Sequence, residues 1–154
     1  MRAVVIPKPV TVLLLLVMTG TIVGVTLWMA GKSYANLDPI PFDDIRFLAK
    51  RLNEKPISTH VLALLVVPMV ANVLLFVPWG FFLFITLYSV ERPTLQTKVL
   101  TVLLPLSFSL GIEGWQYFLP SRVADIYDVI WNTCGGIIGA ILGHARLRVR
   151  FEFK

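Results

Sequence analysis

Polar and ionisable side chains gather in one strongly apolar part of the chain, between residues 113 and 132. They are Glu113, Gln116, Arg122, Asp125, Asp128 and Asn132. Because lipid offers such groups no hydrogen bonds, they normally face protein or a water-filled cavity. Carboxylates placed close together can act as acid and base, relay protons, or bind a divalent cation through their oxygens. The cluster is therefore the first candidate for a functional site.

The second half of the cluster predicts one face of a helix. At roughly 100° per residue, its polar residues and the glycines that follow fall within about a quarter turn. These residues are Asp125, Asp128, Asn132, Gly135, Gly139 and Gly143. Small residues allow helix backbones to approach each other closely. The face is therefore expected to lie against a neighbouring helix or a ligand.

The charges of the cluster allow two interpretations. In the first, Arg122 neutralises one acid at the start of a helix, where the macrodipole also favours negative charge. Asn132 or Asp128 then bonds the polar pair of the preceding helix, which is Glu113 and Gln116. In the second, about two excess negative charges are buried, which is unfavourable unless protons, a cation or a cationic ligand group join them. This excess favours a site over a purely architectural network.

The composition indicates a membrane protein. Of the 154 residues, 56% are hydrophobic and only 15% are charged, against roughly 25% charged residues in an average soluble domain. The net charge of +5 fits cytoplasmic loops beside anionic lipids. Because no basic stripe is interleaved with aromatic residues, nucleic acid is not expected as a partner. The single cysteine, Cys134, excludes an internal disulfide and a cysteine metal cluster.

Four apolar stretches are each long enough to cross about 30 Å of hydrocarbon. They are expected at about residues 10–29, 59–88, 99–119 and 123–145. A signal peptide is the alternative for the first, but its apolar region is longer than the roughly 7–15 residues usual there. The sequence therefore predicts an all-α fold, a four-transmembrane-helix bundle that forms a single domain over residues 1–154.

The longest polar interlude lies within residues 30–58. Asp43 or Asp44 can cap a short amphipathic helix there, which lies either flat in the headgroup region or packed on the bundle. An even number of spans puts both termini on one side of the membrane. The basic C-terminal tail, HARLRVRFEFK, then predicts cytoplasmic termini, an extracytoplasmic first loop, and acids in the outer half of the membrane.

The polar motifs resemble those of a known family. NLDPIPF occurs in the first loop, NVLLFVPWGF in the second span, and E-x-x-Q precedes R-x-x-D-x-x-D-x-x-x-N-x-x-G-x-x-x-G. The last two motifs comprise Glu113, Gln116, Arg122, Asp125, Asp128, Asn132, Gly135 and Gly139. Over most of its length the chain resembles the VanZ-like family of small bacterial membrane proteins. The resemblance implies a multi-pass protein of the bacterial plasma membrane and an association with teicoplanin resistance, but it implies no reaction.

The preferred hypothesis is that the protein binds an envelope lipid or a lipid-linked cell-wall precursor at the outer leaflet. Such binding would blunt a membrane-anchoring glycopeptide such as teicoplanin by changing access to its target. Neither a cofactor nor a metal is expected, and an enzymatic reaction is not favoured. The residues expected to bind the ligand are Asn72, Glu113, Gln116, Arg122, Asp125, Asp128 and Asn132.

Two alternatives stay open. One is an intramembrane enzyme that acts on such a lipid, with Glu113, Asp125 and Asp128 as acid, base or cation ligands. The other is a small proton-coupled transporter that uses the same acids. Four spans are few for a transporter, so this second alternative requires a homo-oligomer.

Overall fold

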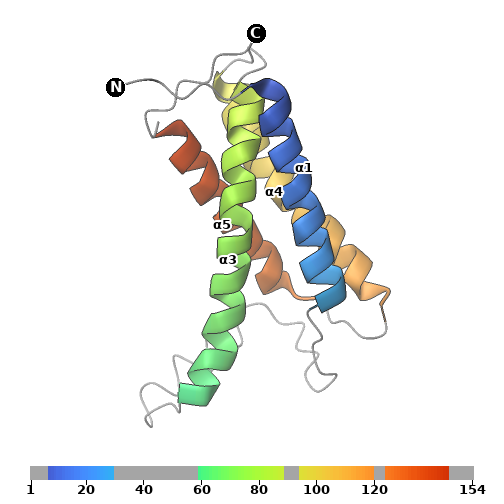
Figure 1. Ribbon diagram of the computed structural model, residues 1–154. Coiled ribbons are helices and arrows are strands. Elements are labelled where there is room, and N and C mark those ends of the chain that lie inside the picture. Colours follow the sequence, from blue (N-terminus) through green and yellow to red (C-terminus); the bar gives the residue numbers. More distant parts are fainter. Residues whose placement is uncertain (1–6, 30–58, 89–93, 120–123, 146–154) are drawn as a thin grey trace.

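The fold consists of helices (Figure 1). The computed structural model describes residues 7–29, 59–88, 94–119 and 124–145. Its elements, in chain order, are α1 (Lys8–Gly24), the π-helical turn η1 (Val25–Met29), α3 (Thr59–Tyr88), α4 (Thr94–Tyr117) and α5 (Ile126–His144). No strand occurs in these ranges, which confirms the predicted all-α class.

The helices have the length and composition needed to cross a bilayer. The segments long and apolar enough are Lys8–Leu27, Val66–Tyr88, Leu95–Tyr117 and Ile126–His144. The predicted four-helix membrane architecture is therefore confirmed. The short amphipathic helix expected within residues 30–58 lies outside the described residues.

Two helices begin at residues other than the expected ones. Helix α4 begins at Thr94 rather than near residue 99, because its first turns contain polar residues that continue the helix beyond the apolar run. Helix α5 begins at Ile126 rather than near residue 123, because Asp125 takes the N-cap position with an extended backbone. The boundary of a helix is thus set by its cap as well as by its hydrophobicity.

Successive helices run in opposite directions (Figure 1). The end of α4 and the start of α5 therefore lie at the same end of the bundle as the end of α1 and the start of α3. Helix α3, with 30 residues, extends beyond the other helices at this end. The polar cluster of the sequence consequently lies near one end of the bundle, and not at its middle.

Glycines bring the backbones of α3 and α5 into contact. A Cβ atom added to Gly80 would meet the backbone carbonyl of Gly136, and one added to Gly139 would meet the carbonyl oxygen of Val77. Gly136 also lies against Pro105 of α4, whose ring carbons would be 2.7 Å from an added Cβ. Small residues hold membrane helices together by such close packing. The predicted glycine face of α5 is therefore its contact with the neighbouring helices.

An aromatic cluster joins the other helices. The ring centroids of Phe76, Trp79 and Phe108 lie 5.2–5.9 Å apart, which links α3 to α4. Trp79 Nε1 donates a hydrogen bond to Thr19 Oγ1 of α1 at 2.9 Å. Ile22 of α1 is fully buried in the same core. Ring packing thus links α3 to α4, and a hydrogen bond and a buried isoleucine join α1 to them, whereas close backbone contact brings α5 against α3.

The glycine contact leads to a prediction about stability. Gly80→Ala places a methyl group against the Gly136 carbonyl, so we expect the free energy of unfolding to fall by about 1–3 kcal/mol. Gly111→Ala on α4 is the matched control, because a Cβ atom there meets nothing within 4 Å and alanine favours a helix. Thermal denaturation in mild detergent measures both variants. Equal melting temperatures would contradict the backbone contact.

Candidate functional site

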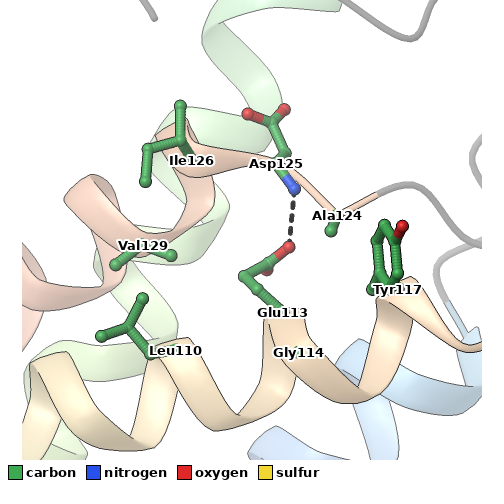
Figure 2. A pocket seen from close by; sticks show the side chains of 8 residues that line it. All are labelled: Leu110, Glu113, Gly114, Tyr117, Ala124, Asp125, Ile126 and Val129. Carbon is green, nitrogen blue, oxygen red and sulfur yellow. Dashed lines mark hydrogen bonds between the residues drawn. The ribbon is translucent and has the colours of Figure 1, made fainter. Parts of the chain in front are cut away.

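The start of α5 is fixed by a hydrogen bond from its N-cap residue to α4. Asp125 has an extended backbone (φ −131°, ψ 119°), and its carboxylate accepts from the Tyr127 backbone N–H at 2.9 Å. The backbone N–H of Asp125 donates to Glu113 Oε2 at 2.7 Å, as Figure 2 shows. Asp125 therefore caps its own helix with its side chain and binds α4 with its main chain.

Glu113 is buried although it carries a carboxylate. Only 7% of its surface is exposed, whereas Tyr117, one turn further along α4, is 76% exposed. The bond from Asp125 is charge-assisted if the carboxylate is ionised, and such bonds are roughly twice as strong as neutral ones. The N-terminus of α5 also carries a partial positive charge. Both effects stabilise a group that would otherwise be costly to remove from water.

An open groove lies between the end of α4 and the start of α5. Its volume is about 350 Å3, and Glu113 rises from α4 into it, toward the backbone of Asp125 (Figure 2). Leu110 and Ile126, which line the groove, have 49% and 44% of their surfaces exposed, so the groove opens to the outside of the bundle. Its lining consists of Leu110, Glu113, Gly114, Tyr117, Ala124, Asp125, Ile126 and Val129.

The apolar lining of this groove was not expected from the sequence. Leu110 and Tyr117 lie one turn before and one turn after Glu113, and Val129 lies one turn after Asp125. Helix positions three or four residues apart share a face. This spacing of apolar residues around the two acids is the sequence feature from which an apolar lining could have been predicted.

Other predicted residues form hydrogen bonds between helices. Asn72 Nδ2 of α3 donates to Asp128 Oδ1 of α5 at 2.8 Å. Asn132 Nδ2 of α5 donates to Ser109 Oγ of α4 at 2.9 Å. Asp128 and Asn132 are one turn apart, so together they attach the same face of α5 to both of its neighbours.

Gln116 faces the first span. We expected it to bond Asn132 or Asp128, but Gln116 Nε2 donates to the carbonyl oxygen of Thr26 in η1 at 3.0 Å. Arg122, the expected neutralising partner of an acid, lies outside the described residues. The structure therefore places two of the predicted residues on the groove, and four others at contacts between helices.

The three acids are not arranged as ligands of one metal ion. Within the described ranges, no group of three or more His, Cys, Asp or Glu side chains could hold a metal ion. Glu113 and Asp125 line the groove, whereas Asp128 bonds Asn72 on the side of α3. The cation-ligand role considered for these acids therefore has no supporting geometry in the described part of the chain.

The bond between Asn132 and Ser109 leads to a second prediction about stability. Asn132 is 1% exposed, and its Oδ1 atom accepts no hydrogen bond from the described residues. Its Nδ2 atom donates to Ser109 Oγ, and Ser109→Ala removes this acceptor. We expect a loss of about 1 kcal/mol in unfolding free energy. Ser107→Ala, at an exposed position of the same helix, should cost nothing measurable. Equal effects of the two substitutions on thermal denaturation would refute the interhelical bond.

The chain matches one known family over most of its length. The model of the VanZ/LLP1 family matches residues 10–147, a range that contains the groove and the interhelical bonds. No curated protein and no solved structure gave a significant match. Four of the described helices are long and apolar enough to cross a membrane. The chain therefore belongs to the VanZ/LLP1 family and is a membrane protein with four apolar helices.

Proposed function

We propose that the protein binds an envelope amphiphile in the groove between α4 and α5. The observation that carries this proposal is the composition of the lining, which joins apolar side chains to the buried carboxylate of Glu113. Ligand sites usually combine an apolar wall with a few placed polar groups. An acyl chain fits the wall formed by Leu110 and Val129, and a polar headgroup fits the end that carries the acids.

The position of the groove relative to the membrane–water interface supports a lipid as the ligand. Aromatic residues with large exposed surfaces lie at the end of α4 and directly after it: Trp115 is 63%, Tyr117 is 76% and Phe118 is 81% exposed. Exposed tryptophan and tyrosine are typical of the membrane–water interface. Glu113 precedes Tyr117 by one helical turn, which is about 6 Å along the axis. A lipid headgroup at the interface would thus reach Glu113, with its chain directed toward Leu110.

The link to antibiotic susceptibility follows from the ligand. The namesake of the family is associated with resistance to teicoplanin, a glycopeptide that anchors in the membrane. A protein that holds an envelope lipid or a lipid-linked cell-wall precursor at the outer leaflet changes the access of such a drug to its target. We therefore propose that this protein reduces teicoplanin susceptibility by binding that amphiphile and sequestering it from the drug.

The enzyme alternative rests on the two acids of the groove. Glu113 and Asp125 both line it, as an acid–base pair would. Figure 2 shows, however, that the Asp125 carboxylate points away from Glu113, which bonds the Asp125 main chain instead. The Asp125 carboxylate is also used as the helix cap. This geometry favours binding over acid–base catalysis.

Filling the groove should remove the ligand. Leu110→Trp adds a bulky ring to the wall, and we expect roughly tenfold less co-purified lipid, measured by native mass spectrometry from native nanodiscs. Leu103→Trp is the matched control, because Leu103 lies on the same helix and is 48% exposed, against 49% for Leu110. A susceptible bacterium that expresses the wild type should tolerate more teicoplanin than one that expresses Leu110→Trp at equal membrane abundance. If the two tryptophan variants retain equal lipid, the groove is not the binding site.

The proposal places the groove in the outer leaflet of the bacterial plasma membrane, with both termini in the cytoplasm. The start of α1 and the end of α5 lie at the end of the bundle opposite the groove (Figure 1), and the basic tail HARLRVRFEFK follows α5. We expect a C-terminal green fluorescent protein to fluoresce and a C-terminal alkaline phosphatase to be inactive. Insertion of each reporter into residues 30–58 should give the reverse. The opposite pattern would move the groove to the inner leaflet.

A further inference from the structure

We propose that Tyr117 selects the lipid in the groove by donating its phenol hydroxyl to an ester carbonyl oxygen, so that the occupant is an ester-linked glycerolipid. This inference rests on the proposed function, because it names the class of the lipid that the groove holds. Tyr117 lines the groove and is the last residue of α4. Three features of this side chain support the role: its place at the rim, its accessible hydroxyl and its uncharged surroundings.

The Tyr117 side chain stands at the rim of the groove, with space beside it. Tyr117 and Glu113 are four residues apart and share a face of α4. Figure 2 shows both side chains rising from α4 toward the segment that begins α5, with the Tyr117 ring beside Ala124. Phe118 meets this ring edge-on, at 5.5 Å between centroids and 85° between planes. A Cβ atom added to Gly114, another lining residue, would meet nothing within 4 Å, so a ligand has room next to the ring.

The hydroxyl of Tyr117 is available to a ligand. The residue is 76% exposed, and within the described part of the chain its hydroxyl is bonded to no other residue. A phenol has one O–H donor at the tip of an apolar ring. Tyr117 ends the apolar span Leu95–Tyr117 as well as α4, so its tip lies at the edge of the hydrocarbon. A donor at this depth meets the polar groups nearest to the lipid chains.

The acceptor that fits this position is an ester carbonyl. In a glycerolipid the ester groups join the chains to glycerol, so their carbonyl oxygens lie at the edge of the hydrocarbon, while the phosphate lies further toward water. None of the described lining residues is basic, so a phosphate beside Tyr117 would find no countercharge among them. A carbonyl is neutral and requires only a donor. A polyprenyl chain joined directly to phosphate has no carbonyl, and it would leave the hydroxyl without this acceptor.

The experiment compares lipids that differ only in the linkage of their chains. The protein is placed in nanodiscs that contain equal shares of diester and diether phosphatidylcholine with chains of the same length. The two lipids differ in mass, so native mass spectrometry counts each one that remains bound. We expect wild type to retain the diester over the diether by about threefold to tenfold, the effect of one neutral hydrogen bond. Equal retention, or a preference for the diether, would overturn the inference.

Conservative variants connect this preference to the hydroxyl. Tyr117→Phe keeps the ring beside Phe118 but removes the donor, so the diester preference should fall to near unity. Tyr88→Phe is the matched control, because Tyr88 is also an exposed tyrosine at the end of a helix but lies at the opposite end of the bundle. It should keep the wild-type preference. Circular dichroism and thermal denaturation establish that each variant is folded. If folded Tyr117→Phe still prefers the diester, or if Tyr88→Phe loses the preference equally, the Tyr117 hydroxyl does not select the lipid.

The outcomes also separate this inference from the proposed function. If Leu110→Trp loses lipid while wild type shows no linkage preference, the groove binds lipid without the Tyr117 bond, and the inference alone is wrong. If Leu110→Trp and the control Leu103→Trp retain lipid equally, the proposed function itself is wrong. If lipidomics of protein from native membranes finds a polyprenyl-linked precursor in place of a glycerolipid, the assigned class is wrong.

Discussion

The hydrogen bond between the Asp125 main chain and the Glu113 carboxylate determines the rest of the candidate site. It joins the last turns of α4 to the first residue before α5, at a distance of 2.7 Å. The bond gives a buried acid a donor, and it fixes the position at which α5 begins. The groove lies where the end of α4 and the start of α5 meet at this bond.

The packing of α5 against α3 is what allows this bond to form. Gly80 and Gly136 bring the two backbones together, and Pro105 of α4 also packs on Gly136. The side-chain bonds of Asp128 and Asn132 join the same helix to α3 and to α4. These two side-chain bonds give polar groups partners in protein, which lipid would not offer them. The architecture and the groove therefore depend on different residues of the same helix, α5.

The sequence predicted the positions of the helices in the chain better than it predicted which polar side chains bond each other between helices. Apolar runs of sufficient length indicated four spans, and the glycines of the last span indicated a tightly packed face. The partner of each polar residue depends on how the helices are rotated and tilted against one another, which periodicity within one helix does not determine. Gln116 consequently bonds Thr26 of η1 rather than Asn132 or Asp128. Ser109 is an ordinary serine in an apolar run, and nothing in its neighbourhood indicated that it would accept from Asn132. The lining of the groove depends on the same tertiary arrangement, since the spacing of Leu110 and Val129 places them on the helix faces of the two acids but does not show that these faces meet.

Photocrosslinking measures whether a lipid occupies the groove between α4 and α5. A phospholipid with a diazirine in its acyl chain is mixed into nanodiscs that contain the protein, and the labelled peptides are identified by mass spectrometry after irradiation. If a lipid lies in the groove, we expect labelling concentrated at its lining residues Leu110, Ile126 and Val129, and reduced by competition with unlabelled lipid. Uniform labelling in proportion to exposure, with Leu13 and Leu74 on the outer faces of α1 and α3 labelled as strongly as the groove, would contradict it.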